Sequence, residues 1–310
     1  MDKGKIYLGI RIALSFGLIT FFLLKVDLYS LSEHLQEIRL SFLFMAVLTS
    51  LFAWVVNTCK WQRLLSALKI DISFKKLLSL NFIALFYNLF LPGQIAGEII
   101  KGFKINHSHH GAHKVFISIV ADRISGFLAL FIMGFTAIII IERSLYLMLV
   151  MILLVLSLAA LPKILNFAKK SLASILQSWG EKQFFKKHFF PIFESIRTYG
   201  KDKNCLIISL FYSFLFQGLC SLSAYWICLG LGIRISFIVL VWVMAIVFFI
   251  QAMPISISGI GVREGALILL LSQYGIASSK ALAFSLTLFA ISILMSLAGG
   301  VIDIFKIRVT

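Results

Sequence analysis

Six long stretches of this chain are almost free of charged side chains, and this feature constrains the fold more than any other. A helix needs about 20 apolar residues to cross the hydrocarbon layer of a bilayer, and each stretch is about that long. With 60% apolar residues, the chain lies above soluble domains, in which about half the residues are apolar. The sequence therefore predicts an all-α polytopic membrane protein with about six spanning helices, at 6–24, 41–59, 115–141, 144–162, 204–233 and 281–302.

Two further apolar runs are too short to cross a bilayer. Leu77–Leu91 and Phe237–Gln251 each contain about 15 residues, which at about 1.5 Å per residue reach roughly 22 Å into a layer of about 30 Å. Each run ends near a proline and then meets glycines and charged residues. We therefore expect two re-entrant helical hairpins, at 77–105 and 236–272. The residues expected to break them are Pro92, Gly93, Gly97 and Pro254.

The basic residues predict the orientation of the chain. A net charge of +16 would suit nucleic acid in a soluble protein, but in a membrane protein the distribution of Lys and Arg sets the topology. With each hairpin returning to the side it came from, most of the 29 basic residues fall inside, among them Lys60, Lys101 and the cluster from Lys163 to Lys203. We expect a multi-pass protein of the cytoplasmic (inner) cell membrane with both termini in the cytoplasm, and no nucleic-acid partner.

This orientation predicts an inverted repeat within a single integral membrane domain, residues 1–310. A first half-repeat, 41–141, and a second, 204–305, each contain a span, a hairpin and a span, in opposite orientations. Residues 163–203 between them are rich in Lys and Phe and predict a cytoplasmic amphipathic linker, although a solvated linker is equally open for their second part. In such a repeat the substrate site lies near the midplane, where the two broken elements meet.

Five charged residues at predicted membrane depth mark a candidate site: Glu98, Asp122, Arg123, Arg263 and Glu264. Charges at this depth are functional by default, because each costs at least a few kcal/mol. Arginine presents a planar fork that matches phosphate or carboxylate, and the start of a half-helix adds backbone N–H donors. We expect an anion pocket. The alternative is a structural ion-pair cluster, for instance Asp122 with Arg263, that binds nothing.

The glycines beside these charges have two interpretations. Gly93 and Gly97 have the small-residue spacing that favours close helix packing. Gly259 and Gly261 lie between Pro254 and Arg263, where backbone exposure to a ligand and packing are equally open. We therefore count Gly259 and Gly261 among the expected substrate-binding residues.

No metal or cofactor is expected. Four histidines cluster in a predicted cytoplasmic loop, but no carboxylate or cysteine accompanies them at ligand spacing, so chance enrichment in a polar loop is the favoured interpretation. The 4 cysteines have no Cys-x-x-Cys spacing, which indicates neither a zinc site nor a disulfide framework. The histidines are His107, His109, His110 and His113.

Three motifs resemble one known family. Leu91-Pro92-Gly93 with Gly97-Glu98, then Ala121-Asp122-Arg123-Ile124-Ser125-Gly126, then Pro254 with Gly259-Ile260-Gly261-Val262-Arg263-Glu264 look like the lysylphosphatidylglycerol synthase transmembrane-region family. This is the flippase-like domain of the multiple peptide resistance factor and of many stand-alone membrane proteins. The resemblance covers nearly the whole chain. It implies a domain that handles polar lipids, with re-entrant hairpins around a central cavity.

The chain departs from the pattern of this family in two places. Gln94 to Ala96 stands where a further glycine is common, and Lys101 stands where an arginine is common. These differences bear on the substrate more than on the fold. Lysyl transfer belongs to a separate soluble domain in the family, and the spans leave no room for one here, so we expect no such enzyme activity.

The leading functional hypothesis is a lipid flippase or translocator for polar phospholipids or lipid-linked precursors. Arg263 and Arg123 would hold the head-group phosphate, while Glu98, Asp122 and Glu264 would balance charge or bind a cationic group. The expected partners are membrane lipids, either anionic or aminoacylated phospholipids or polyprenyl-linked lipids. A second copy of the chain and a lipid-synthesis enzyme are further candidate partners.

Three alternatives remain open at this stage. The same repeat would suit a secondary transporter of a small anionic solute, which would need a site closed to lipid. An accessory membrane protein for a lipid-modifying enzyme is a further alternative. An intramembrane enzyme is disfavoured, because the sequence lacks a His-Glu-x-x-His zinc motif and a Gly-x-Ser-x-Gly nucleophile motif.

Overall fold

The computed structural model describes residues 28–90, 95–106, 112–142, 199, 202–252, 256 and 258–305. Every regular element in these ranges is a helix, so the all-α prediction is confirmed there. The predicted spans 6–24 and 144–162, most of the linker 163–203, His107, His109, His110, Pro92, Gly93 and Pro254 lie outside them. The helices are α2 Leu28–Gln36, α3 Leu40–Ala67, α4 Phe74–Phe90, α5 Ile95–Asn106, α6 Ala112–Glu142, α10 Lys203–Gly230, α11 Phe237–Ala252, α12 Val262–Ser272 and α13 Ser278–Ile304.

Four of the described helices, α3, α6, α10 and α13, are long and apolar enough to cross a membrane. They correspond to the predicted runs 41–59, 115–141, 204–233 and 281–302. The largest difference is at α3, which continues beyond residue 59 to Ala67. The predicted span 41–59 stops before Lys60 because that residue is charged, yet in the structure Lys60 is only 2% exposed. A charge that finds a partner inside the bundle ends neither the helix nor the span.

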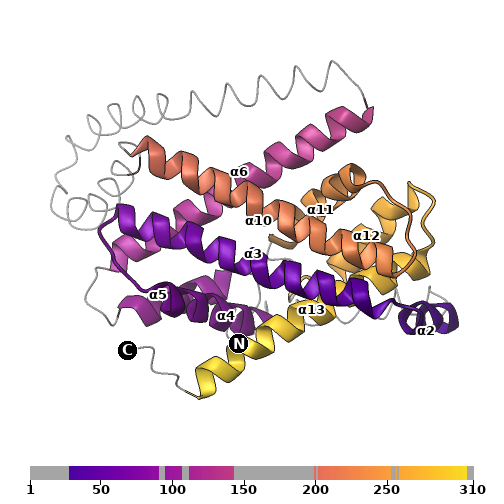
Figure 1. Ribbon diagram of the computed structural model, residues 1–310, viewed down its shortest axis with the longest axis horizontal. Helices are drawn as coiled ribbons and strands as arrows, with labels where there is room; N and C mark the ends of the chain where they lie inside the picture. The colour runs from indigo at the N-terminus through magenta and orange to yellow at the C-terminus, as the bar shows by residue number, and fades with distance from the viewer. Residues whose placement is uncertain are drawn as a thin grey trace, which may run out of the picture.

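The four long helices run in two opposite directions (Figure 1). In this view α3 and α13 run from right to left along the chain, whereas α6 and α10 run from left to right. Helix α3 packs along α10, and small hydroxyl side chains join the two, since Ser50 and Ser223 lie 2.8 Å apart between their hydroxyl oxygens. The carboxylate of Asp202 caps the start of α10 by accepting a hydrogen bond from the backbone N–H of Cys205 at 2.9 Å.

The shorter helices form two pairs at opposite ends of the bundle (Figure 1). Helices α4 and α5 pack on each other toward the left of the view, and α11 and α12 do so toward the right. The packing is exchanged between the two pairs: α4 contacts α13 as α11 contacts α6, and α5 contacts α6 as α12 contacts α13. The predicted hairpins 77–105 and 236–272 therefore coincide with two packed helix pairs.

Close backbone approach holds α4 in place. A Cβ atom added to Gly97 on α5 would lie 2.3 Å from the carbonyl oxygen of Ala84, and one added to Gly299 on α13 would lie 1.9 Å from that of Phe82. No side chain fits at either distance, so these glycines let α5 and α13 press against the α4 backbone. The packing interpretation of Gly97 is thus supported by its geometry.

Two described features extend the fold beyond the predicted elements. Helix α2 was not predicted from the sequence, and it packs on α13. Its nine residues are too few and too polar to stand out as an apolar run. From the predicted linker, Tyr199 is 5% exposed and its hydroxyl donates a hydrogen bond to the carbonyl of Leu64 at 2.8 Å. Tyr199 therefore packs against α3.

Candidate functional site

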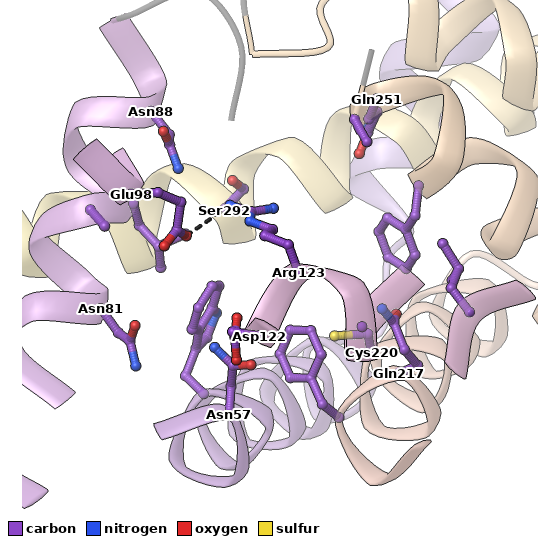
Figure 2. Close-up of a pocket in the computed structure, with 18 of the residues that line it drawn as sticks. Asn57, Asn81, Asn88, Glu98, Asp122, Arg123, Gln217, Cys220, Gln251 and Ser292 are labelled. Atoms are coloured by element: carbon purple, nitrogen blue, oxygen red, sulfur yellow. Dashed lines mark hydrogen bonds and ion pairs between the residues drawn. The ribbon is translucent and has the colours of Figure 1, made fainter. Parts of the chain in front are cut away.

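A cavity of about 330 Å³ lies among α3 to α6 and α10 to α13. Its lining residues come from near the middle of each long helix and from both short pairs (Figure 2). Aromatic and aliphatic side chains form part of the wall, and the rest is polar or charged. The polar and charged residues are Asn57, Lys60, Asn81, Asn88, Glu98, Lys101, Asp122, Arg123, Gln217, Gln251, Ser258, Arg263, Ser292 and Ser296.

Glu98 on α5 is shared between two cations. Its Oε2 lies 2.6 Å from Lys101 Nζ, and its Oε1 accepts a hydrogen bond from Arg123 Nη2 at 2.7 Å (Figure 2). Lys101 Nζ also donates to Asn81 Oδ1 at 3.1 Å and lies 4.4 Å from the ring centroid of Trp61. Glu98, Asn81 and Trp61 thus surround the ammonium group of Lys101 in its buried position. Arg123 lies on α6, so its ion pair with Glu98 links α5 to α6.

Asp122, also on α6, pairs with Lys60 of α3. Lys60 Nζ lies 2.9 Å from Asp122 Oδ1 and 3.3 Å from the backbone oxygen of the same residue. The two side chains are 3% and 11% exposed, so both charges are removed from solvent. Asp122 thus pairs with Lys60 and not with Arg263, the partner considered from the sequence. The sequence separation of such pairs is large, and hydropathy carries no information on which helix faces meet.

Arg263 and Glu264 form a separate sealed pair at the start of α12. Arg263 Nη2 lies 2.5 Å from Glu264 Oε1, and Arg263 Nε donates to the hydroxyl of Ser285 at 2.9 Å. Ser285 in turn donates to Glu264 Oε1 at 3.0 Å, and Glu264 Oε2 accepts the backbone N–H of Gly261 at 2.6 Å. Arg263 is 6% exposed and Glu264 is fully buried. The cavity lining includes Arg263, whereas Glu264 lies behind it as a support.

The glycines before this pair shape the turn into α12. Gly259 and Gly261 have φ angles of 78° and 83°, in the region that side chains with a Cβ rarely adopt. Neither residue lines the cavity. Their conformation accounts for both glycines without a ligand, so the structure places them as turn residues next to Arg263.

The site as a whole carries mixed charge with a cationic excess. Four cationic side chains face three carboxylates, which leaves the set with one net positive charge. Inside a bundle of apolar helices such charges interact more strongly than in water. The arrangement suits an anionic group that also needs hydrogen bonds. The cations are Lys60, Lys101, Arg123 and Arg263, and the carboxylates are Glu98, Asp122 and Glu264.

Sequence reasoning missed two of these cations and all of the amides. Lys60 and Lys101 were counted as cytoplasmic residues that set the topology, but they are 2% and 3% exposed inside the bundle. That assignment was wrong because the positive-inside rule counts charges near span ends and does not see which way a side chain turns. Asn57 and Gln217 lie inside predicted spans. The cost of a polar amide at that depth was a signal available in the sequence.

Comparisons with known proteins agree with this architecture. The model of the family described as lysylphosphatidylglycerol synthase TM region matches residues 8–300. A UPF0104 membrane protein of Pyrococcus horikoshii is 28% identical over 273 residues, which cover 80% of this chain and 81% of that protein. No solved structure matches the chain. The family match extends over almost the whole sequence and includes every helix that lines the cavity, so the chain belongs to the lysylphosphatidylglycerol synthase TM region family.

Proposed function

We propose that this chain translocates polar lipids across the cytoplasmic membrane, with the head group in the central cavity and the acyl or prenyl chains in the bilayer. One observation carries the proposal: a cavity lined by four cations lies halfway along helices whose outer faces are apolar. Exposed phenylalanines such as Phe44, Phe52 and Phe211 cover those outer faces, at 62%, 54% and 63% exposure. Charges placed at such depth are costly unless they serve a ligand or a pathway.

The proposed topology has six spans and two re-entrant hairpins in an inverted repeat. The α4–α5 and α11–α12 pairs lie at opposite ends of the bundle, which is the placement expected of hairpins that enter from opposite membrane faces. The exchanged packing of α4 on α13 and α11 on α6 supports two related halves. With the N-terminus in the cytoplasm, α4–α5 would enter from inside and α11–α12 from outside.

Arg123 is the proposed first contact of the head group. Its side chain is 33% exposed, against 3% for Lys60, 4% for Lys101 and 7% for Arg263. A phosphate that draws Arg123 away from Glu98 leaves that carboxylate paired with Lys101, so no buried charge is stranded during the exchange. The bound phosphate would gain a bidentate partner. This exchange gives the first hairpin a role in admitting and releasing the lipid.

Translocation is tested in proteoliposomes that contain a fluorescent phospholipid on both leaflets and receive a membrane-impermeant quencher. We expect wild-type protein to expose the inner-leaflet pool, and Arg123→Ala to slow this by at least about tenfold, the effect of losing one charge-assisted hydrogen bond of about 1.5–3 kcal/mol. Arg63→Ala is the matched control, since Arg63 is an exposed arginine with a carboxylate 3.9 Å away at Asp202. Equal rates for wild type, Arg123→Ala and empty vesicles would contradict the proposal.

A second candidate is a transporter of a small anionic solute. The cavity volume of about 330 Å³ is at the lower end of the range for small-molecule sites, about 300–1,000 Å³. It would hold a free phosphorylated solute as well as a head group. Uptake of radiolabelled glycerol phosphate into the same proteoliposomes, without movement of the fluorescent lipid, would favour this candidate over the first.

A further inference from the structure

We propose that the cavity selects a head group that combines a phosphate with several hydroxyl groups, as in a lipid carrying a phosphorylated sugar or cyclitol. This inference rests on the proposed function and narrows its substrate class. It separates two classes that the sequence left open, because it disfavours the cationic head group of an aminoacylated lipid. Three sets of residues carry it: unpartnered amides, neutralised carboxylates and aromatic walls.

Three amide side chains face the cavity without partners. Among the described residues, Asn57, Gln217 and Gln251 make no side-chain hydrogen bond, and all three line the cavity. Asn57 is only 7% exposed. In Figure 2, Asn57 and Gln217 lie on one side of the cavity and Gln251 lies on the opposite side. Buried polar groups are normally hydrogen-bonded, so the buried Asn57, with the partly exposed Gln217 and Gln251 unpaired around the same space, indicates that a ligand completes their bonding.

Amides match hydroxyl groups better than they match ammonium groups. Each amide has a carbonyl oxygen that accepts and an NH₂ group that donates two hydrogen bonds, and each hydroxyl likewise donates and accepts. A fourth amide, Asn88, already accepts the backbone N–H of Gly97 at 2.8 Å through Oδ1, which leaves its NH₂ group to donate. An ammonium group only donates, and it would leave these NH₂ groups unpaired. A polyhydroxyl ring satisfies both kinds of atom.

The carboxylates that might attract a cationic head group are already neutralised. Lys101 and Arg123 pair with Glu98, and Lys60 pairs with Asp122. A cationic lipid would have to displace these cations, whereas a phosphate would contact the arginines that line the cavity, Arg123 and Arg263. Arg263 bonds to Glu264 and Ser285 through Nε and Nη2, and its Nη1 makes no hydrogen bond to any described residue. Nη1 is therefore available to a phosphate oxygen.

Aromatic side chains supply the remaining wall. Trp54 and Phe216 line the cavity and contact each other edge to face, with 5.6 Å between ring centroids. Phe127 and Phe248 also contribute to the lining. The C–H faces of a sugar or cyclitol ring pack well on aromatic rings, while its hydroxyls point to the edges. Amides beside aromatic rings therefore fit a ring that is polar at its rim and apolar on its faces.

Lipid binding to purified protein in detergent tests this selection. The probes are phosphatidylinositol, phosphatidic acid and lysyl-phosphatidylglycerol with identical acyl chains, together with water-soluble glycerophosphoinositol. We expect phosphatidylinositol to bind at least about tenfold more tightly than phosphatidic acid, since two or more hydrogen bonds to hydroxyls distinguish them. Gln217→Ala and Gln251→Ala should each reduce that preference by about threefold or more without weakening phosphatidic acid. Gln273→Ala, which removes an exposed amide directly after the end of α12, is the matched control.

The outcomes separate this inference from the proposed function. Equal binding of phosphatidylinositol and phosphatidic acid, or tighter binding of lysyl-phosphatidylglycerol, overturns the selection of a polyhydroxyl phosphate. Preference for phosphatidylinositol without its movement in proteoliposomes supports the selection and contradicts translocation. Glycerophosphoinositol binding as tightly as the intact lipid also supports the selection, and it assigns the head group to a free solute. Movement of lipids without any head-group preference supports translocation and overturns the selection.

Discussion

The α4–α5 and α11–α12 pairs each bring a glutamate into an ion pair with an arginine that lines the cavity, yet the two ion pairs differ. In the first, Glu98 of α5 is divided between Lys101 of its own helix and Arg123 of α6, whose side chain is 33% exposed. In the second, Arg263 and Glu264 are neighbours on α12 and are sealed by Ser285, with 7% and 0% side-chain exposure. Similar packing of helices therefore surrounds one ion pair that is shared and partly exposed and one that is buried.

We propose that the two pairs have different roles, the shared pair being exchangeable and the buried pair fixed. A pair that shares its carboxylate with a second cation can open without leaving a charge unpaired, which suits the side that meets an incoming ligand. A pair closed by a hydroxyl and a backbone N–H holds its geometry and presents one face of the arginine to the cavity. Four predictions test this contrast, in order of expected size.

The largest contrast is expected between the two glutamates. Glu264→Gln should destabilise the protein by about 3–5 kcal/mol, because it removes the charge partner of buried Arg263. The new amide also has only one oxygen, so its NH₂ group either faces the N–H of Gly261 or replaces the oxygen that accepts from Ser285. Glu98→Gln should cost less, about 2–3 kcal/mol, because Lys101 loses its charge partner but keeps Asn81 and Trp61, the amide oxygen still accepts, and Arg123 is partly exposed. Thermal unfolding in detergent measures both. A larger loss for Glu98→Gln would reverse the assignment of fixed and exchangeable pairs.

The two arginines should differ in their tolerance of lysine. Arg263→Lys loses a donor that reaches Ser285 and Glu264 together, and we expect about 1.5–3 kcal/mol of destabilisation. Arg123→Lys replaces the hydrogen bond to Glu98 at a partly exposed position, with an expected cost below about 1 kcal/mol. The unfolding midpoints of the two variants, measured beside wild type, check this. Equal tolerance of lysine at both positions would show that the guanidinium geometry of Arg263 does not hold the Arg263–Glu264 pair.

The glycines of the two segments should respond through different mechanisms. Gly97→Ala should cost about 1–3 kcal/mol, because the new methyl group overlaps the Ala84 carbonyl and forces α5 away from α4. Gly261→Ala should cost about 1–3 kcal/mol through its φ angle of 83°. The control Gly102→Ala, also on α5, places its Cβ 3.7 Å from Ile119 Cδ1 and should be neutral or slightly stabilising. A neutral Gly97→Ala would contradict the close approach of α4 and α5.

The smallest effect is expected away from the cavity. Arg63 lies 3.9 Å from Asp202, and the two side chains are 41% and 38% exposed. Exposed pairs contribute about 0–1 kcal/mol, and salt screens them. Arg63→Ala should therefore change the unfolding midpoint little, at low and at high salt. A loss as large as that of Arg123→Ala would mean that burial does not distinguish the charges of the site from those of the surface.

The sequence predicted the helices well because hydropathy is a local property. The charge-free run 77–91 anticipated α4, which ends at Phe90, whereas Gly97, expected to break the hairpin, lies inside α5. The four described long helices also lie where apolar runs predicted spans. Helix α2 was missed because its few apolar residues form no run.

The partners of the buried charges could not be predicted in the same way. Lys60 and Asp122 are far apart in the chain. From sequence alone, a lysine at the end of an apolar run is predicted to lie outside the membrane, next to the end of the span. Its burial depends on which face of α3 meets α6, a property of tertiary packing. Asn57 and Gln217 gave a weaker sequence signal for the cavity. Uncharged amides do not interrupt an apolar run, although they are costly within one.

The central claim is that the cavity, and not the outer surface of the helices, receives the head group. A phospholipid with a photoreactive group on its head and another with the same group at the end of an acyl chain test it most directly, in native-like membranes. After irradiation, the head-group probe should label cavity residues such as Trp54, Phe127 and Phe216, and Arg123→Ala should reduce that labelling. The acyl-chain probe should label outward residues such as Phe44 and Phe52. Labelling of the outward residues by both probes, with none in the cavity, would contradict the account.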